Sequence, residues 1–300
     1  MAKTGLTTQA DFTITAREVD FVTRFGANWD ALREILGIMR PIRKAPGTKL
    51  VSSVVSMKGN LQGGALVGEG EEIPYTEFEV KPAAYADIVL EKYAKAVSIE
   101  AVAKWGARTA VQKTDEEFLN QLQGNVLDRF YTFLQTGTLT DTESDFQMGV
   151  AMSIGLVVDK FKKMHKDVTS IVTFVNTLDA YRYLGAANLT VQTAFGIQYV
   201  KNFLGAETMI LSSEIPSGTI ISIPSDNIDL YYIDPGDGDF AELGLNYTVQ
   251  GETNLIGFHA NGNYNTAVGE SFALMGLTLW AEYLDGIAVV EVTASNPSEG

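Results

Sequence analysis

Cysteine is absent from this 300-residue sequence, and histidine occurs only twice. Without cysteine the chain cannot form disulfide bonds, thiolate metal sites or a cysteine nucleophile. His165 lies among lysines and His259 lies between Phe258 and Ala260, and neither has the spacing of a metal site or a catalytic motif. A phosphate-binding glycine loop ending in Gly-Lys-Ser/Thr and a G-x-S-x-G motif are also missing. The sequence therefore predicts a structural or binding protein that is not an enzyme and needs no cofactor.

Basic residues are scarce and unevenly placed. The chain has 22 Lys and Arg against 37 Asp and Glu, for a net charge of -15, and no Lys or Arg follows Lys201. An acidic surface repels phosphate, so we do not expect sequence-independent nucleic-acid binding by the last third of the chain. Solubility is the plainer interpretation of this acidity, and a cationic partner is the alternative.

Long hydrophobic runs are also lacking. The nearly uncharged run 146–158 is too short to cross a bilayer, and the run 274–290 is interrupted by Glu282 and Asp285. The N-terminal residues have no apolar core like that of a signal peptide. With 46% hydrophobic residues, the sequence predicts a globular chain that neither spans a membrane nor enters a secretory pathway.

The most regular feature is an amphipathic segment over residues 114–137. Its apolar residues recur at helical spacing and predict one helix of about 22 residues, which is on the order of 33 Å long. Thr114 is expected to cap the first turn together with Glu117, and Gly137 is expected to end the helix. The apolar stripe consists of Phe118, Leu122, Val126, Phe130 and Leu134, widened by Leu119, Leu127 and Tyr131.

The N-terminal part of the chain is expected to be an arm followed by helices. Residues 1–13 are polar and predict a flexible arm. Apolar residues at helical spacing predict two short helices, over 15–25 and 28–39, with Asn28 capping the second. Pro46 and Gly47 then predict a turn.

Residues 48–97 have an extended character. The β-prone stretch LVSSVVSM and the flexible stretch KGNLQGGA are followed by further extended segments up to Val97. If each arm of such a hairpin holds roughly 15 residues, the hairpin is about 50 Å long, whereas the radius of gyration of a compact chain of this length is only ~19 Å. An isolated two-stranded ribbon is marginal in water, so this length favours packing on another molecule. The alternative is an ordinary sheet within the same chain.

After the long helix, strands alternate with helices and predict an α/β or α+β subdomain. A helix is expected over 146–165, and Asn176 is expected to cap a helix over 178–186. A short helix is expected over 198–206. The expected strands are 169–175, 207–213, 218–224, 229–233, 245–250 and 287–292, and residues 296–300 are expected to be a disordered end.

The best candidate for a metal site is the acidic stretch DPGDGD. Its Asp234, Asp237 and Asp239 are close enough in sequence to share a hard cation. The stretch lacks the closing glutamate of a calcium loop, and its proline and glycines favour a plain turn. We therefore expect no metal there.

The order of these elements resembles the major capsid proteins of tailed bacteriophages of the Hong Kong 97 type. Residues 65–74, ALVGEGEEIP, resemble a segment of that family's extended loop, and residues 78–102 resemble its return strands. The buried strand followed by Asn176 resembles the strand-to-Asn connection of that family's axial domain, and residues 285–292 resemble its closing strand. The resemblance implies an α+β fold with an N-terminal arm, an extended β-hairpin loop, a long spine helix, and peripheral and axial domains.

This resemblance divides the chain into 1–47, the N-terminal arm; 48–97, the extended hairpin loop; 98–145, the peripheral domain with the spine helix; 146–242, the axial domain; and 243–300, the return to the peripheral domain and C-terminal tail. Members of the family lay the extended loop on a neighbouring subunit. We therefore hypothesise assembly contacts along the hairpin, at Lys58, Asn60, Gly63, Gly64, Glu69, Glu71, Glu72, Glu77, Glu79 and Lys81.

The implied function is that of a coat protein which self-assembles into hexamers and pentamers of an icosahedral phage head. The head encloses double-stranded DNA without sequence-specific binding, and the implied locations are the virion and, during assembly, the host cytoplasm. No fused scaffold is recognisable, which implies a separate scaffolding protein or a processed chain, with portal and decoration proteins as further partners. Covalent crosslinking, known in some members, is not carried over to Lys58 and Asn60.

Three other functions stay open on the sequence. An encapsulin-like compartment has the same fold and encloses protein cargo. A β-rich surface or receptor-binding module would be monomeric or trimeric. An enzyme would have to depend on residues such as Asp234, Asp237 or His259.

Overall fold

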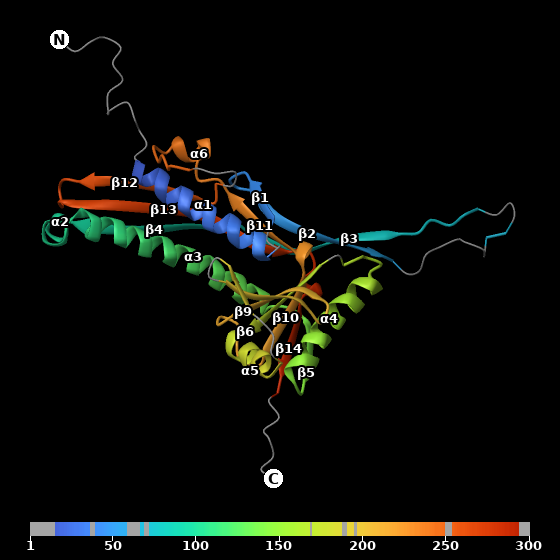
Figure 1. Ribbon diagram of the computed structural model, residues 1–300. Helices are drawn as coiled ribbons and strands as arrows, with labels where there is room; N and C mark the ends of the chain where they lie inside the picture. Colours follow the sequence, from blue (N-terminus) through green and yellow to red (C-terminus); the bar gives the residue numbers. More distant parts are fainter. Residues whose placement is uncertain are drawn as a thin grey trace.

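The molecule consists of two β-sheets with their helices and a hairpin that projects from the body (Figure 1). None of the described helices is long and apolar enough to cross a membrane. The chain has both helices and strands, as the expected α+β class requires. The computed structural model describes residues 16–36, 40–58, 67–68, 72–168, 170–187, 191–194, 197–249 and 254–293.

The first sheet is organised around the long strand β13 (Val268–Ala281). One edge of β13 pairs with β12 (Ile256–Asn263). The other edge pairs first with β4 (Leu90–Ser98) and then with β11 (Ile228–Ile233). Strand β1 (Arg40–Lys44) extends the sheet by a parallel pairing with β11. The apolar run that includes residues 271–281 is thus a central strand, which is most buried over 273–277 and has neighbours along both edges up to Met275.

Helices α1 (Ala16–Leu36) and α3 (Lys113–Leu134) pack beside each other on this sheet. The ring of Phe21 stacks on Phe258 at 4.0 Å and lies 6.0 Å from Phe118, so it joins α1 to both β12 and α3. The predicted stripe of the long helix is largely confirmed. Its buried members are Leu119, Leu122, Val126, Phe130, Tyr131 and Leu134.

The prediction of two short N-terminal helices was wrong. A single helix, α1, runs through Asn28, because Phe21, Phe25 and Trp29 continue one buried stripe at a spacing of four residues. Continuous packing of this stripe on the sheet outweighs the local capping preference of Asn28. The predicted arm over residues 1–13 lies outside the described residues.

Both predicted ends of the long helix were also wrong. Helix α2 (Ile99–Trp105) ends at Gly106, and the π-helical turn η3 (Arg108–Gln112) runs directly into α3, so the Thr114 hydroxyl donates back to the carbonyl of Ala110 at 2.8 Å and caps nothing. Helix α3 ends at Leu134, three residues before Gly137. Gly137 serves a close approach instead, because a Cβ there would lie 2.7 Å from the carbonyl oxygen of Ile287.

The second sheet has seven strands. Their order is β5 (Leu139–Glu143), β14 (Ala288–Val292), β10 (Thr219–Pro224), β6 (Ile171–Asn176), β9 (Ala206–Ser212), β8 (Ile197–Phe203) and β7 (Gln192–Ala194). Helix α4 (Phe146–Lys163) packs on β10 and β14. Asn176 caps α5 (Thr177–Ala187) as predicted, accepting from the backbone N–H of Leu178 at 2.9 Å.

Two local predictions in the C-terminal half were wrong. Residues 198–206 were expected to be helical but lie mostly in β8, because Tyr199 pairs with Ile210 and Gly205 has the positive φ of +97° that a tight turn to β9 requires. Residues 245–250 were expected to form a strand. Among the described residues 245–249, only Thr248 makes a bridge, with Phe258.

The acidic stretch DPGDGD forms a turn, as its composition favoured. Asp237 caps the short helix α6 (Gly238–Ala241) and accepts from the backbone N–H of Asp239. Asp234 accepts from the N–H of Gly236 at 2.8 Å and lies 3.4 Å from the guanidinium of Arg43. These carboxylates therefore hold the turn against β1.

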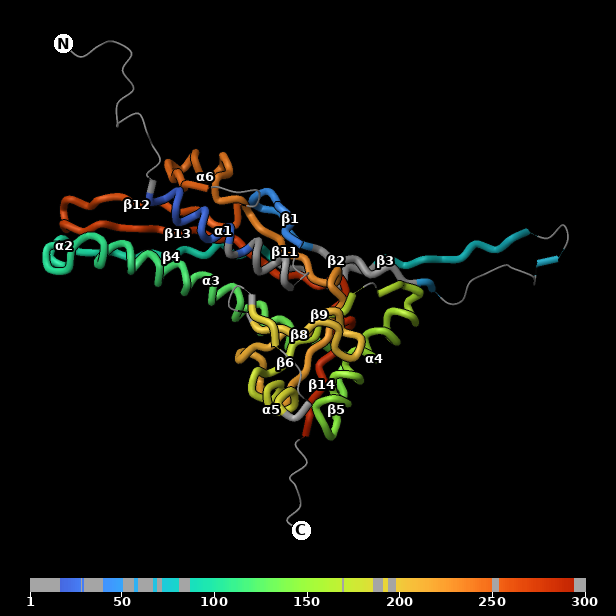
Figure 2. Tube along the Cα trace, viewed as in Figure 1, coloured from blue at the N-terminus to red at the C-terminus, as the bar shows by residue number. Residues whose placement is uncertain are grey.

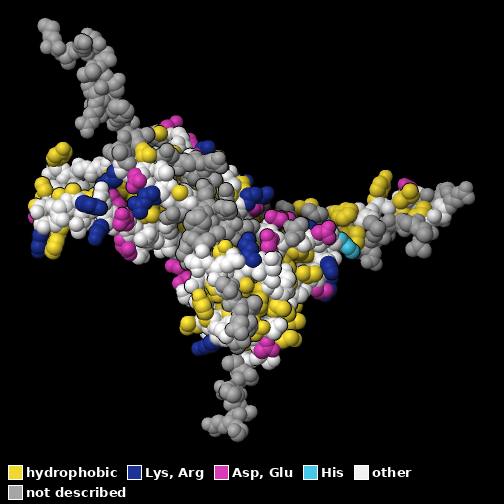
Figure 3. Space-filling view, viewed as in Figure 1, with side chains coloured by type: hydrophobic (Ala, Val, Ile, Leu, Met, Phe, Trp, Pro, Cys, Tyr) yellow, Lys and Arg dark blue, Asp and Glu magenta, His cyan; other side chains and the backbone are white. Residues whose placement is uncertain are grey.

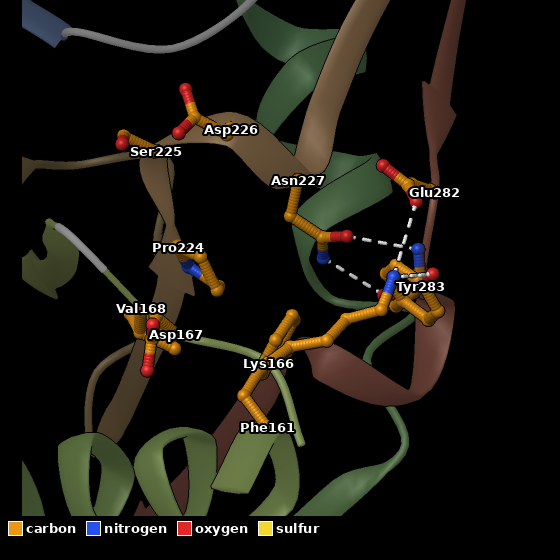
Figure 4. Close-up of a pocket in the computed structure, with 10 residues that line it drawn as sticks. All are labelled: Phe161, Lys166, Asp167, Val168, Pro224, Ser225, Asp226, Asn227, Glu282 and Tyr283. Atoms are coloured by element: carbon orange, nitrogen blue, oxygen red, sulfur yellow. Dashed lines mark hydrogen bonds and ion pairs between the residues drawn. The ribbon is translucent and has the colours of Figure 1, made fainter. Parts of the chain in front are cut away.

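The two sheets are joined where the chain passes from β10 to β11 and from β13 to β14. The Asn227 side chain bonds to both the N–H and the carbonyl of Tyr283, each at 2.8 Å, and so ties the two connections together. Lys166 contacts the Tyr283 hydroxyl and lies 3.7 Å from Glu282 across a cavity of about 160 Å³ (Figure 4). These bonds fix the sheets relative to each other.

A buried ion cluster holds α1, α3 and the first sheet together. The Arg17 guanidinium donates two hydrogen bonds to the Asp115 carboxylate, at 2.6 and 2.7 Å, and a third to the Ser271 hydroxyl. The Lys95 ammonium of β4 lies 2.6 Å from the same carboxylate. Burial alone would raise the pKa of Asp115, but the hydrogen bonds from Arg17 and Lys95 outweigh it and hold this pKa below its usual value.

We predict that Asp115→Asn lowers the free energy of unfolding at pH 7 by about 2–3 kcal/mol, because two cations lose a buried charged acceptor. Since the folded-state pKa of Asp115 is depressed, its contribution is full above the unfolded-state pKa of about 4 and is lost as the pH falls below it. Urea unfolding of the unmodified chain and of Asp115→Asn at several pH values should show that the difference in their free energies of unfolding becomes smaller in that acid range. Asp128→Asn, on the exposed side of α3, is the control and should change little. An equal loss of unfolding free energy in Asp115→Asn and Asp128→Asn would contradict the stabilising role of the Asp115 carboxylate.

Candidate assembly surface

The projecting hairpin is built from β2 (Lys49–Met57) and β3 (Phe78–Asp87). The strands pair antiparallel from Lys49 opposite Asp87 to Met57 opposite Phe78, and they form a two-stranded sheet of their own. Nine residues at about 3.3 Å each give roughly 30 Å of paired ribbon. Figure 2 shows this ribbon leaving the body of the molecule.

The second arm of the hairpin is shorter than the sequence suggested. The extended segment was expected to run to Val97, but β3 ends at Asp87 and the next strand, β4, pairs with β13 in the first sheet. The residues after Asp87 therefore anchor the hairpin to the body. This anchoring fixes the direction in which the ribbon projects.

One face of the ribbon is apolar and exposed. Phe78 and Val80 alternate along β3 and are 61% and 60% exposed, and Met57 stands opposite Phe78 on the same face. Tyr75, just before β3, is 93% exposed. Exposed apolar side chains in a row on an unpaired ribbon are typical of a surface that another molecule covers.

The structure places half of the hypothesised contact residues. Lys58 lies at the end of β2 and pairs with Glu77, with 3.0 Å between Nζ and Oε1. Glu72 and Glu79 are exposed, and Lys81 lies in β3 opposite Val54. The other five, Asn60, Gly63, Gly64, Glu69 and Glu71, lie outside the described residues.

A second exposed apolar surface, which the sequence analysis missed, lies at the opposite end of the molecule. It combines Ile99 and Trp105 of α2 with Tyr264 in the turn between β12 and β13, and Tyr264 is 99% exposed. A groove of about 380 Å³ runs between α2 and this turn. The two segments are more than 150 residues apart in sequence, so no local pattern predicts that they form one surface. The one available signal is Trp105, a large apolar residue beside Lys104.

Comparison with solved structures identifies the fold. Over 97% of this chain and 94% of the other, the structure superposes on the capsid structure of the cyanophage P-SCSP1u, with a TM-score of 0.55 and 11% identity. The capsid of cyanophage A-1(L) matches 96% of this chain and 99% of its own, with a TM-score of 0.54 and 10% identity. The SrpI encapsulin of Synechococcus elongatus PCC 7942 matches over 99% and 93%, with a TM-score of 0.51 and 11% identity.

No protein-family model and no curated protein matches the sequence. The structural matches are mostly to phage capsid proteins, and they extend along nearly the whole chain. The chain therefore has the Hong Kong 97-type capsid fold, an α+β fold shared by phage capsids and encapsulins. The suspected resemblance is confirmed at the level of the fold.

We predict that replacing the apolar face of the ribbon, with Phe78→Ser and Val80→Ser together, leaves the subunit folded but removes its ability to associate. Both side chains are exposed, so the change in the free energy of unfolding should stay within about 1 kcal/mol. Urea unfolding and analytical ultracentrifugation measure the two effects. Leu243→Ser, which removes an exposed apolar side chain near α6, is the control and should leave association intact. Unchanged association of the double variant would contradict a role for this face.

Proposed function

We propose that the chain is the major capsid protein of a tailed bacteriophage, which self-assembles into hexamers and pentamers of an icosahedral head. The observation that carries the proposal is the projecting ribbon with an apolar face that its own subunit does not cover. In a closed shell every ribbon meets the same surface of a neighbour, so one contact repeated by symmetry stabilises the whole particle. The subunit would be located in the virion, after assembly in the host cytoplasm.

The charge distribution supports a container for DNA that does not bind it by sequence. The last third of the chain carries no Lys or Arg, and the net charge is -15. Surfaces of this sign repel phosphate. Double-stranded DNA would thus be enclosed by the shell without sequence-specific contacts. A separate scaffolding protein, a portal and decoration proteins are the further partners of such a subunit.

The second candidate is an encapsulin-like compartment that encloses protein cargo. The match to the SrpI encapsulin over 99% of this chain supports it, since the same fold serves both kinds of shell. The content of purified particles separates the two: DNA is expected for a phage head, and a copurified protein for a compartment. A β-rich surface or receptor-binding module is the remaining alternative, and it should stay monomeric or trimeric at high concentration.

Deleting residues 59–68 should leave a folded subunit and abolish shells. The deleted residues lie between β2 and β3 in the sequence, so the deletion leaves the paired strands and the core unchanged. The shortened hairpin should no longer reach a neighbouring subunit. Size-exclusion chromatography with light scattering and electron microscopy measures the outcome. A variant in which residues 59–68 are replaced by glycine and serine at constant length separates reach from side-chain contacts. Normal shells from the deletion would overturn the proposed role of the hairpin.

A further inference from the structure

We propose that the groove between α2 and the turn between β12 and β13 is the docking site for residues 10–15 of the same chain. These residues directly precede α1 and lie outside the described residues. The apolar side chains that they bring are Phe12 and Ile14. The inference concerns a single subunit and does not depend on the proposed shell.

The groove has an apolar lining that the described part of the chain leaves open. Four half-buried valines line it, from four different elements: Val97 of β4, Val102 of α2, Val111 of η3 and Val268 of β13. Covering such side chains with apolar groups is favourable, because it removes their remaining surface from water. The volume of about 380 Å³ is at the lower end of the range for binding pockets. The groove therefore fits a few apolar side chains and not a folded domain.

The groove lies at the end of the molecule where α1 begins. Arg17, in the first turn of α1, is itself one of the residues that line the groove. Helix α1 starts over β12 and runs away from the turn between β12 and β13 (Figure 1). Figure 3 shows hydrophobic side chains, in yellow, on the surface at this end of the molecule. The N-terminal end of α1 is thus the end nearest the groove.

The short distance along the chain brings both apolar side chains within reach. Ile14 is three residues and Phe12 is five residues before Arg17. An extended chain spans at most about 3.6 Å per residue, so their backbones lie at most roughly 11 and 18 Å from a residue that lines the groove. A tether of this length keeps the segment at an effective concentration in the millimolar range. Weak intrinsic affinity is therefore sufficient for docking within one chain.

Charge favours the same segment. The cations of Arg17 and Lys95 share one carboxylate, that of Asp115, so this ion cluster has a net positive charge beside the groove. The Arg17 side chain is still 33% exposed. Residues 10–15 carry a single charged side chain, the acidic Asp11. Opposite charges at an apolar contact fix its register, so the segment matches the groove in both respects.

Disulfide trapping in the whole 300-residue chain tests the proposal, because no native cysteine competes. Ile14→Cys is combined with Val102→Cys or with Val268→Cys in the groove, and with Asn261→Cys as the matched control. Asn261 is exposed and precedes the groove residue Gly262, but it does not line the groove. After mild oxidation, at least one groove pair should form roughly fivefold more intramolecular disulfide than the control pair. Non-reducing gels and mass spectrometry of the linked peptides measure the yield, and circular dichroism verifies folding.

Filling the groove provides a second measurement. Gly269 stands opposite Val97 in the pairing of β4 with β13, so a side chain there points to the same face as Val97. A Cβ at Gly269 would meet no atom closer than 3.9 Å, so Gly269→Leu fills the groove without displacing the core. Added to Ile14→Cys with Val102→Cys, this substitution should lower the disulfide yield roughly fivefold. Gly155→Leu, on the exposed side of α4, is the control and should leave the yield unchanged.

Two results would overturn the proposal. The first is an equal disulfide yield in the groove pairs and the control pair, or a yield that Gly269→Leu does not lower. The second is a disulfide that links two chains, which would assign the groove to the segment of a second copy. Because the yield is measured on the subunit, neither result bears on the proposed shell, whose failure would show as a lack of particles.

Discussion

The structure depends on one constraint: a two-stranded ribbon cannot bury its own apolar face. Backbone hydrogen bonds satisfy only the inner edges of β2 and β3, and the face with Phe78 and Val80 stays in water. Within one subunit this arrangement is unfavourable. In the proposed shell a second copy covers this face, which would make the arrangement favourable.

The rest of the molecule holds the ribbon and the opposite end at a fixed separation. Strand β13 connects both regions, because it pairs with β4 near the turn that carries Tyr264 and with β11 near the junction of the two sheets. Helix α3 runs alongside, and the Asp115 cluster ties its first turn to α1 and β4. The Asn227 bonds to Tyr283 tie together the two connections between the sheets. Because the body is rigid, a contact made at one end fixes the orientation of the other end.

Periodic packing signals were the part of this fold that the sequence predicted well. The stripe from Leu119 to Leu134, the helix over 146–163, and the Asn176 cap depend on neighbours close in sequence, so local patterns are sufficient. Residues 198–206 show the limit, because β8 exists through its pairing with β9 and not through local propensity. The break expected at Asn28 failed for the same reason, since Trp29 packs on distant strands.

The candidate site shows the same division. An exposed hairpin with glutamates could be predicted from the turn residues and the alternation at Phe78 and Val80. The second exposed surface could not, because Ile99 and Tyr264 line one groove only after β4 has paired with β13. Sequence patterns identify a surface formed by one segment. A surface formed by two distant segments requires the topology.

Size-exclusion chromatography with light scattering, followed by electron microscopy of the earliest fraction, tests the central claim most directly. Our account predicts closed shells or rings of the unmodified chain, because every hairpin then finds a neighbour that covers its apolar face. A compact monomer that persists at high concentration, with scaffolding protein supplied, would contradict the account.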